Sequence, residues 1–545
     1  MKASVVCLSL GLICHPLLAF SEAEDAVGNA GTAEAAPAAE PHFAIWEYRV
    51  EGNTLLERTA VELALTPFLG PDKSYETVRG AADALSRAYR DAGYPVVNVD
   101  IPEQDVVAGV VKLRVVEGKV SRVRVSGSRY FLLSDIKKEV NSLQPSQAIH
   151  IPSFRSDINR LNRMSNDLRV TPVLKQGRTP GTVEVDLRVK DHLPLHGSLE
   201  LNNHSSQNTS SSRLNASISY DNLWQRDHSL SLQYQTSPEK PQEVKVLAGT
   251  YILPVIDESS RFAIYGVKSD SEVSTLTDLT VVGNGKIFGT RFVRALGAAD
   301  RYVHSLSLGF DYKDFNESVN LAGADSDKTP ISYTTFTGIY NGTWFAESST
   351  TKLGLSIVQG MRDLLGGGDP VEFNDKRYGS RANFFYIQSS LKHEYRLASD
   401  WRFNGRLKFQ VADSPLISNE QFSSGGASSV RGYYESEILG DNGINGSLEA
   451  STPNMLGDKA ELRLRGFVDG AWVQIKDSVV STYINNVLTT TLSDKESSIA
   501  SIGVGVDFTF EKSTQVTLDC GYALKEASGV DNGDIRLHGE IRFEF

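Results

Sequence analysis

A single arginine in a glycine-rich segment and an aspartate further along the chain are the residues whose types and surroundings best suit a specific interaction. Arg431 is the only strongly charged residue between Glu420 and Glu435. Asp469 lies in a segment where apolar and polar residues alternate, on the side that carries the charges. A guanidinium group can donate two charge-assisted hydrogen bonds to one carboxylate. We therefore predict that the segment folds back and that Arg431 pairs with Asp469; an ordinary surface arginine is the alternative.

Motifs for hydrolytic chemistry are missing from the sequence. It contains neither His-Glu-x-x-His nor Gly-x-Ser-x-Gly, and its 10 histidines are scattered along the chain. We therefore expect no catalytic residues, no metal site and no cofactor, and we predict that the protein is not an enzyme.

Composition narrows the function classes further. The chain of 545 residues has a net charge of −12, which argues against a general nucleic-acid-binding protein, because such proteins usually present a basic face. Only 3 cysteines occur, so a disulfide-stapled scaffold is excluded. Abundant Gly, Tyr and Phe suit a large β structure better than a helical one.

The N-terminal segment has the features of a targeting signal. Residues 1–23 combine a positive start, an apolar stretch and small residues near the end, which predicts a secretory signal peptide. The Ala/Glu/Pro-rich residues 24–42 are expected to form a linker or a plug segment. Because Cys7 and Cys14 leave with the signal peptide, the mature chain keeps only Cys520. After residue 23 no run of roughly 18 apolar residues occurs, so the mature protein either is soluble or spans a membrane as a barrel.

Two similar segments follow. Residues 43–118 predict the order strand, helix, helix, strand, strand, with Ser74 as the cap of the second helix. The same order recurs over residues 119–192, which indicates an internal repeat of two small α+β domains. The open edge of such a sheet can accept an extended peptide as an added strand, which predicts peptide binding; the alternative is that both domains are spacers.

From residue 193 to residue 545 the sequence alternates with a period of two. Apolar and aromatic residues occupy one face of each predicted strand, and polar or charged residues occupy the other. A soluble β-sandwich and an outer-membrane barrel both fit this pattern. Strands of about 9–11 residues and the strict confinement of charge to one face favour the barrel, because a charge facing lipid is costly. At roughly 22 residues per strand and connection, the segment predicts a transmembrane antiparallel barrel of about 16 strands, with a lumen loop around residues 420–445.

Short motifs in the barrel segment resemble those of the outer-membrane superfamily that inserts or exports proteins. The resemblance rests on a loop motif, preceded by Gly425 and Gly426, and on a strand motif around Asp469. The loop motif is Val430-Arg431-Gly432-Tyr433, and the strand motif is Phe467-Val468-Asp469-Gly470-Ala471. The resemblance implies that Arg431 and Asp469 lock the loop inside the lumen.

A third group of residues narrows the resemblance to one branch. Pro102, Gln104, Gly109 and Gly118 occur in a pattern similar to the first polypeptide-transport-associated (POTRA) domain of two-partner-secretion transporters of the TpsB type, the haemolysin/adhesin secretion-activation family. The resemblance implies two periplasmic POTRA domains and a translocation pore in the outer membrane of a Gram-negative bacterium. It also implies a large, unfolded TpsA-type partner, an adhesin or haemolysin, that the pore secretes, and we expect a monomer surrounded by outer-membrane lipid. A barrel insertase of the same superfamily and a passive porin are the alternatives.

Overall fold

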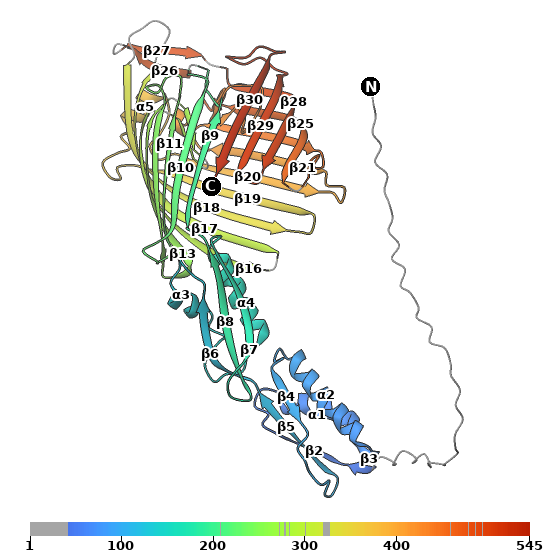
Figure 1. Ribbon diagram of the computed structural model, residues 1–545. Helices are drawn as coiled ribbons and strands as arrows, with labels where there is room; N and C mark the ends of the chain where they lie inside the picture. The colour runs from blue at the N-terminus through green and yellow to red at the C-terminus, as the bar shows by residue number, and fades with distance from the viewer. Residues whose placement is uncertain are drawn as a thin grey trace, which may run out of the picture. The chain divides into compact units, whose positions relative to one another are not determined.

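The computed structural model describes residues 42–545 except 208, 272, 277–278, 283, 300, 320–326, 458, 478, 485–486 and 493. The expected signal peptide and all but the last residue of the expected linker therefore lie outside the described residues. Figure 1 shows the described chain as two small α+β domains and a large β-barrel. None of the helices in the described part of the chain combines the length and the apolarity needed to cross a bilayer.

The first small domain has a three-stranded sheet in the order β2-β5-β4. Its sheet strands are β2 (Glu47–Glu51), β4 (Val97–Asp100) and β5 (Val110–Glu117); its helices are α1 (Arg58–Leu65) and α2 (Tyr75–Asp91); β1 (Phe43–Ile45) pairs separately with β3 (Gly70–Lys73). A capping box of Ser74 and Thr77 opens α2, as the sequence predicts for Ser74. The apolar stripe of α2, including Leu85 and Tyr89, is buried in the domain core.

The second small domain repeats this order of elements. Its strands are β6 (Lys119–Ser126), β7 (Leu168–Gln176) and β8 (Thr182–Asp191), arranged in the order β6-β8-β7, and its helices are α3 (Leu133–Lys138) and α4 (Ile151–Met164). The prediction of two α+β domains is confirmed. In each sheet the strand nearest the barrel in sequence lies at the centre and the other two strands lie at the edges.

Sixteen antiparallel strands of the described chain close into a barrel, which confirms the predicted architecture and strand number. They are β9 (Leu195–Asn202), β10 (Arg213–Leu223), β11 (His228–Thr236), β12 (Lys245–Val255), β13 (Asp257–Asp270), β16 (Gly285–Ala299), β17 (Tyr302–Val319), β18 (Asp327–Phe345), β19 (Ser349–Met361), β20 (Phe385–Arg396), β21 (Arg402–Ala412), β24 (Asn442–Ser451), β25 (Ala460–Gln474), β28 (Glu496–Phe510), β29 (Thr514–Ala523) and β30 (Ile535–Glu544). The first strand, β9, pairs with the last, β30, and closes the sheet.

Several strands are longer than the sequence pattern suggests. β17 has 18 residues and β18 has 19, and the two stay in register from Tyr302↔Trp344 to Val319↔Asp327. Because about 9–11 residues suffice to cross a bilayer at a tilt, these strands run on as a hairpin beyond the apolar band.

Smaller elements occupy the connections. These are the hairpins β14 (Val273–Leu276) with β15 (Leu279–Val282) and β26 (Val479–Ile484) with β27 (Val487–Leu492), the helix α5 (Pro370–Lys376), and β22 (Phe422–Ser424) with β23 (Ile438–Gly440). The last pair belongs to the segment that carries Arg431.

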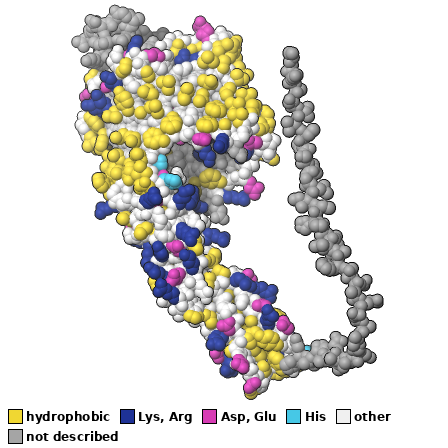
Figure 2. All heavy atoms as spheres, viewed as in Figure 1, with side chains coloured by type: hydrophobic (Ala, Val, Ile, Leu, Met, Phe, Trp, Pro, Cys, Tyr) yellow, Lys and Arg dark blue, Asp and Glu magenta, His cyan; other side chains and the backbone are white. Residues whose placement is uncertain are grey.

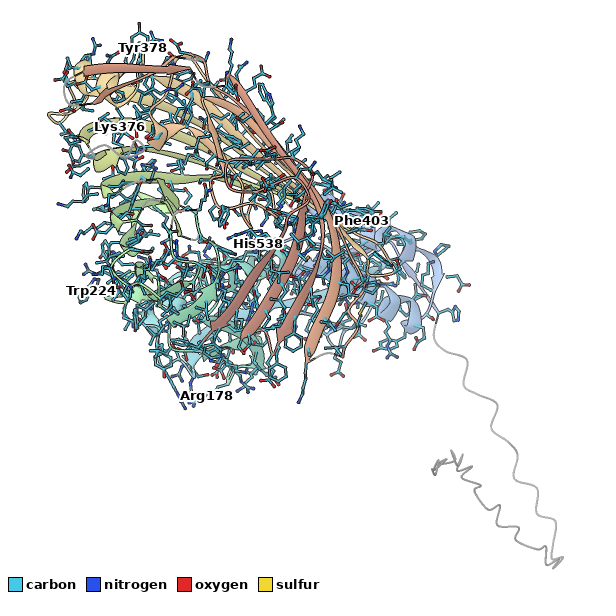
Figure 3. The ribbon with its side chains drawn as sticks, turned by 90° about the horizontal axis from the view of Figure 1, so that it is seen from above. Arg178, Trp224, Lys376, Tyr378, Phe403 and His538 are labelled. Carbon is cyan, nitrogen blue, oxygen red and sulfur yellow. The ribbon has the colours of Figure 1, made fainter. Side chains whose placement is uncertain are left out.

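The barrel is apolar on the outside and polar within. On β25 the side chains of Leu464 and Val468 are 45% and 53% exposed, whereas Arg463 and Asp469 on the opposite face are buried. Hydrophobic side chains cover the barrel face seen in Figure 2, and Figure 3 shows Phe403 on the outer side of the strands and His538 on the inner side. This distribution inverts that of a water-soluble protein and suits a lipid-facing surface.

Candidate functional site: an ion pair that holds a loop inside the barrel

The segment between β21 and β24, residues 413–441, folds into the barrel interior. It begins before residue 420, the predicted start of the lumen loop. It also ends before residue 445, the predicted end, because β24 already begins at Asn442. Within it, β22 and β23 form a short hairpin. The side chains of Val430, Arg431 and Tyr433 at its tip are completely or almost completely buried, so this segment, the lumen loop, packs against the inner barrel wall.

The structure brings Arg431 and Asp469 into direct contact. Arg431 Nε donates to Asp469 Oδ2 at 2.7 Å and Nη2 donates to Oδ1 at 2.8 Å. The backbone N–H of Arg431 adds a third hydrogen bond, to Oδ2 at 3.1 Å. The two residues are only 1% and 2% exposed. This geometry is the two-pronged charge-assisted contact that fixes a side chain in both position and orientation.

Two further acids and an aromatic ring surround the same guanidinium group. Arg431 Nη1 lies 2.8 Å from Glu449 Oε1 and 3.7 Å from Asp519 Oδ2. The guanidinium carbon lies 3.5 Å from the centre of the Phe467 ring, a stacked cation–π contact. The sequence singles out Asp469 and Phe467 but gives no signal for Glu449 or Asp519, because these lie on other strands and become neighbours only when the barrel closes.

The residues after Arg431 fix the loop to the neighbouring part of the wall, on β28 and β30 and just after β29. Gly432 N–H donates to His538 Nε2 at 3.0 Å. The Tyr433 hydroxyl bonds to two carbonyl oxygens, donating to that of Ala500 or to that of Lys525, which lie 2.9 and 2.7 Å away. Gly432 has φ +95°, a left-handed conformation that favours glycine. The motif residues thus act as anchors on the barrel wall.

A glycine outside the predicted motifs makes the close approach possible. A Cβ atom on Gly521 of β29 would lie 2.5 Å from the Gly432 nitrogen, a distance that packing forbids. We expect Gly521→Ala to unseat the lumen loop, measured as new trypsin cleavage in the loop of the detergent-solubilised protein. Gly466→Ala is the matched control, because a Cβ there meets nothing within 4 Å. Equal protease resistance of both variants would contradict this reading.

The other predicted glycines differ in how strictly the fold needs them. Gly425 and Gly426 both have positive φ, and a Cβ at either would come within 2.5 Å of Tyr434 O or of the Glu435 side chain. A Cβ on Gly470 would meet only Ile499 O at 3.9 Å, an ordinary contact. Steric closeness therefore explains the loop glycines but not Gly470.

Two buried acids toward the ends of the lumen loop, Asp441 and Glu420, provide further anchors that the sequence did not predict. Asp441 is fully buried and forms a pair with Arg377, just after α5, at 2.5 and 2.9 Å. Its carboxylate also accepts hydrogen bonds from the backbone N–H groups of Leu416 and Lys476. The pair clips the connection that contains α5 to the end of the lumen loop.

At the other end of the loop, Glu420 accepts hydrogen bonds from three barrel side chains. The donors are Lys313, Tyr333 and Tyr386, at 2.5, 2.6 and 2.9 Å. The loop is therefore held at its beginning, its tip and its end by ionic contacts with low solvent access. Such contacts are strong because few waters compete for the charges.

We expect Asp441→Ala to destabilise this arrangement by about 3–5 kcal/mol, because the Arg377 charge would stay buried without its partner. The measurement is the temperature at which the folded barrel band disappears on a semi-native gel. Glu347→Ala is the control, since the Glu347 side chain is 92% exposed and lies 4.0 Å from Arg301. Identical transition temperatures for the two variants would refute the anchoring role.

The signature residues of the first small domain stabilise its fold. Gln104 Nε2 donates to Lys112 O and Gln104 Oε1 accepts from Lys112 N–H, at 2.8 and 2.7 Å, so the segment just after Pro102 is fastened to β5. Gly109 accepts backbone hydrogen bonds from Trp46 and Glu47. A Cβ on Gly118 would lie 2.4 Å from Val96 O.

The carboxylate of Glu117, next to Gly118, also stabilises the fold of this domain. Glu117 is buried and accepts hydrogen bonds from the N–H groups of Thr54 and Leu55, at 2.7 and 3.0 Å. Burial and the negative charge of Glu117 raise the pKa of Tyr89 above its usual value. Glu117 thus holds the segment that precedes α1.

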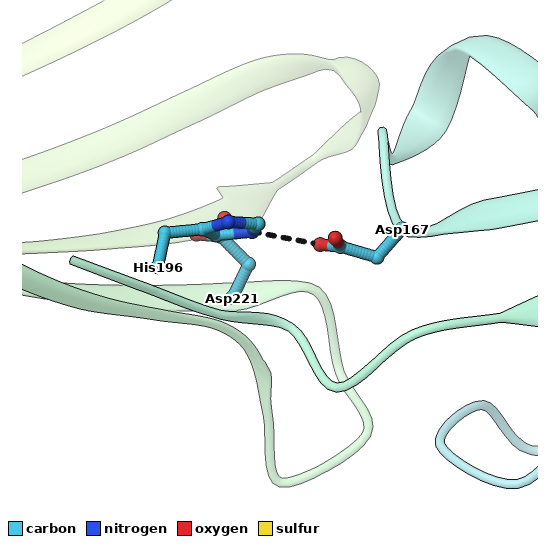
Figure 4. A group of neighbouring side chains, drawn as sticks. All are labelled: Asp167, His196 and Asp221. Carbon is cyan, nitrogen blue, oxygen red and sulfur yellow. Dashed lines mark hydrogen bonds and ion pairs between the residues drawn. The ribbon is translucent and has the colours of Figure 1, made fainter. Parts of the chain in front are cut away.

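One cluster of metal-ligating side chain types lies at the base of the barrel strands. The His196 Nε2 of β9 lies 3.0 Å from Asp167 Oδ2, and 3.8 Å from Asp221 Oδ2 at the end of β10 (Figure 4). Among the described residues these three form the group that could hold a metal ion. Hydrogen bonding between the imidazole and the Asp167 carboxylate already accounts for the geometry.

Two protein-family models match this chain. The model of the family described as "Haemolysin secretion/activation protein ShlB/FhaC/HecB" matches residues 181–506, more than half of the chain. The model described as "POTRA domain, ShlB-type" matches residues 43–118.

Individual relatives and solved structures agree with these matches. The outer membrane transporter CdiB of Dickeya dadantii (strain 3937) is 23% identical over 422 residues, 74% of this chain and 71% of that protein. The heme/hemopexin transporter protein HuxB of Haemophilus influenzae is 22% identical over 410 residues, with 74% and 71% covered. The structure of CdiB from Escherichia coli has a similar fold, with a TM-score of 0.59 and 17% identity over 94% of this chain and 93% of that chain.

Proposed function

This chain belongs to the haemolysin secretion/activation family, whose members are outer-membrane transporters of the TpsB type with periplasmic POTRA domains, and we propose that it secretes one large partner protein. The proposed partner is of the TpsA type and reaches the pore unfolded. The observation that carries the proposal is the lumen loop, held by the buried Arg431–Asp469 pair inside a closed barrel.

Recognition of the partner is assigned to the two POTRA domains. Each has a three-stranded sheet with two edge strands, β2 and β4 in the first domain and β6 and β7 in the second. An edge strand presents unpaired backbone groups, to which an extended segment of the partner can add as a further strand. Main-chain hydrogen bonds of this kind need no folded epitope, which suits an unfolded partner.

Transport requires the lumen loop to leave or shift from its resting position. Two cavities of about 560 and 380 Å³ border the loop, and residues of the loop line both. The loop is held by ion pairs and hydrogen bonds, which can exchange for water when the loop moves. Folding of the partner at the cell surface would then bias its movement outward, because a domain stabilised by about 5–15 kcal/mol does not slide back readily.

The chain is proposed to act as a monomeric pore in outer-membrane lipid, without a catalytic step or a cofactor. The barrel insertase and the passive porin remain the competing functions. Family membership supports transport. The anchored loop can act as a gate for the pore, and a passive porin does not need such a gate.

The proposal is tested by producing the full chain in a Gram-negative host together with a candidate TpsA-type protein from the same genome. We expect the partner in the medium only when the chain is present. A partner that stays in the periplasm, while small solutes pass the outer membrane, would select the porin. Accumulation of inserted barrels instead of a secreted partner would select the insertase.

A further inference from the structure

A row of basic side chains crosses three neighbouring strands on the inner barrel wall. Lys352 of β19 lies directly opposite Lys392 of β20, and Lys392 lies directly opposite Arg406 of β21. Lys408 follows two positions after Arg406 and therefore points to the same side of the sheet. These four residues are called the basic wall.

The basic wall faces the lumen and not the lipid. All four side chains line the 560 Å³ cavity together with residues of the lumen loop, among them Ser428. The residues that alternate with them, such as Leu391 and Leu407, are exposed on the outer, apolar face. The wall thus borders the space between barrel and loop.

Most of this positive charge is not neutralised. Arg406 pairs with Glu449 at 2.9 Å. Among the ion pairs of the described residues, none involves Lys352, Lys392 or Lys408; Lys408 only lies 5.7 Å from the centre of the Phe422 ring on the lumen loop. Glu435 lines the same cavity from the loop side but makes no ion pair with these lysines. The cavity therefore carries a positive excess.

The like charges of the basic wall are expected to lower the stability of the barrel sheet. Like charges directly opposite each other on neighbouring strands destabilise a sheet, and here two such pairings follow one another in a single row. Two arginines of the neighbouring lumen wall do face acids: Arg431 meets Asp469 and Arg465 meets Asp519, each at 2.7 Å. A basic row in which three of four side chains are in no ion pair of the described residues, and which lines a cavity, is suited to a transient anionic ligand.

The wall also connects the two cavities. Lys392 and Arg406 line both the 560 Å³ cavity and the 380 Å³ cavity, and the second cavity reaches Arg431. Small polar residues such as Ser423 and Asn445 make up much of the remaining lining. No large apolar pocket is offered to a side chain there, so charge is the main means of recognition.

We propose that the basic wall is a binding track for carboxylate groups, and that its ligands are the acidic side chains of the polypeptide in transit. This inference rests on the proposed function for the identity of the ligand, but the binding of carboxylates does not depend on it. Contacts with exposed lysines such as these are weak, which lets a chain pass without being trapped.

The test measures binding of a fluorescently labelled penta-glutamate peptide to the purified full chain in detergent, with an identically labelled penta-glutamine peptide as reference. We expect penta-glutamate to bind about ten-fold more tightly, as three exposed charge contacts allow, and high salt to abolish the difference. The variant Lys352→Gln/Lys392→Gln/Lys408→Gln should lose the preference.

Two matched variants keep the result interpretable. Replacing the same three lysines by arginine retains the charge and should retain the preference. Replacing the exposed lysines of three connections, Lys459, Lys495 and Lys512, by glutamine removes the same charge elsewhere and should leave the preference intact. A glutamine variant of the basic wall that still prefers penta-glutamate, or equal loss in the control, would overturn the inference.

A second readout separates this inference from the proposed function. In planar bilayers under a KCl gradient, the glutamine variant of the basic wall should shift the reversal potential toward cation selectivity. If selectivity and peptide binding change as expected but no partner is secreted by the wild-type chain, the basic wall stands and the export function falls. If the partner is secreted but replacing the three lysines changes neither peptide binding nor ion selectivity, the export function stands and the basic wall is refuted as a binding track.

Discussion

Replacing Arg431 by alanine is expected to abolish secretion of the partner while the barrel still inserts into the outer membrane. The substitution leaves Asp469 buried without its cation, whereas Glu449 and Asp519 lose one of two basic neighbours and keep Arg406 and Arg465. Breaking a buried pair in this way costs about 3–5 kcal/mol. Because the loop contributes no strand to the barrel sheet, that cost falls on the seating of the loop and not on the strand pairing.

The measurement is the amount of partner in the medium, compared with the amount of folded barrel in the outer-membrane fraction. Arg542→Ala is the matched control, since Arg542 is one-third exposed and its acidic partners, Glu544 at 2.8 Å and Glu200 at 4.0 Å, both keep contact with solvent. We expect at least a hundred-fold loss of secretion for Arg431→Ala, as about 3 kcal/mol implies, and near-normal secretion for the control. Wild-type secretion by Arg431→Ala would remove the lock from the mechanism.

Removing residues 43–190 is expected to leave a barrel that inserts and conducts ions but secretes nothing. The cut ends before β9 at Leu195, so all sixteen barrel strands remain whole. It removes both sheets to which an extended partner segment could add. The barrel loses the hydrogen bond between Asp167 and His196 and those that Asn222 and Gln225 donate to Tyr130 O, contacts worth only about 0.5–3 kcal/mol each.

Secretion in cells and single-channel conductance in planar bilayers check this second expectation together. Conductance without secretion supports recognition by the POTRA domains. Persistent secretion by the shortened chain would show that the partner is recognised by the barrel itself. Loss of both would point to a failure of insertion, which the folded-barrel band on a semi-native gel detects independently.

The sequence by itself determined the architecture of this protein. Alternation such as that of Arg463, Leu464 and Asp469 reports which face of a strand meets lipid, because lipid admits almost no charge. The repeated order of strands and helices across residues 43–192 likewise revealed two domains, since each needs its own apolar core. The lone charge of Arg431 and the alternation around Asp469, together with the family resemblance, predicted the pair that the structure brings together.

Only the tertiary structure decided what surrounds that pair. Glu449, Asp519 and Gly521 approach the loop tip from different strands, and Asp441 meets Arg377 across a long connection. The basic row of Lys352, Lys392 and Arg406 exists only because three strands pair in one particular register. Periodicity along one strand fixes the face on which a residue lies, but its height relative to residues on other strands depends on the stagger with which the barrel closes.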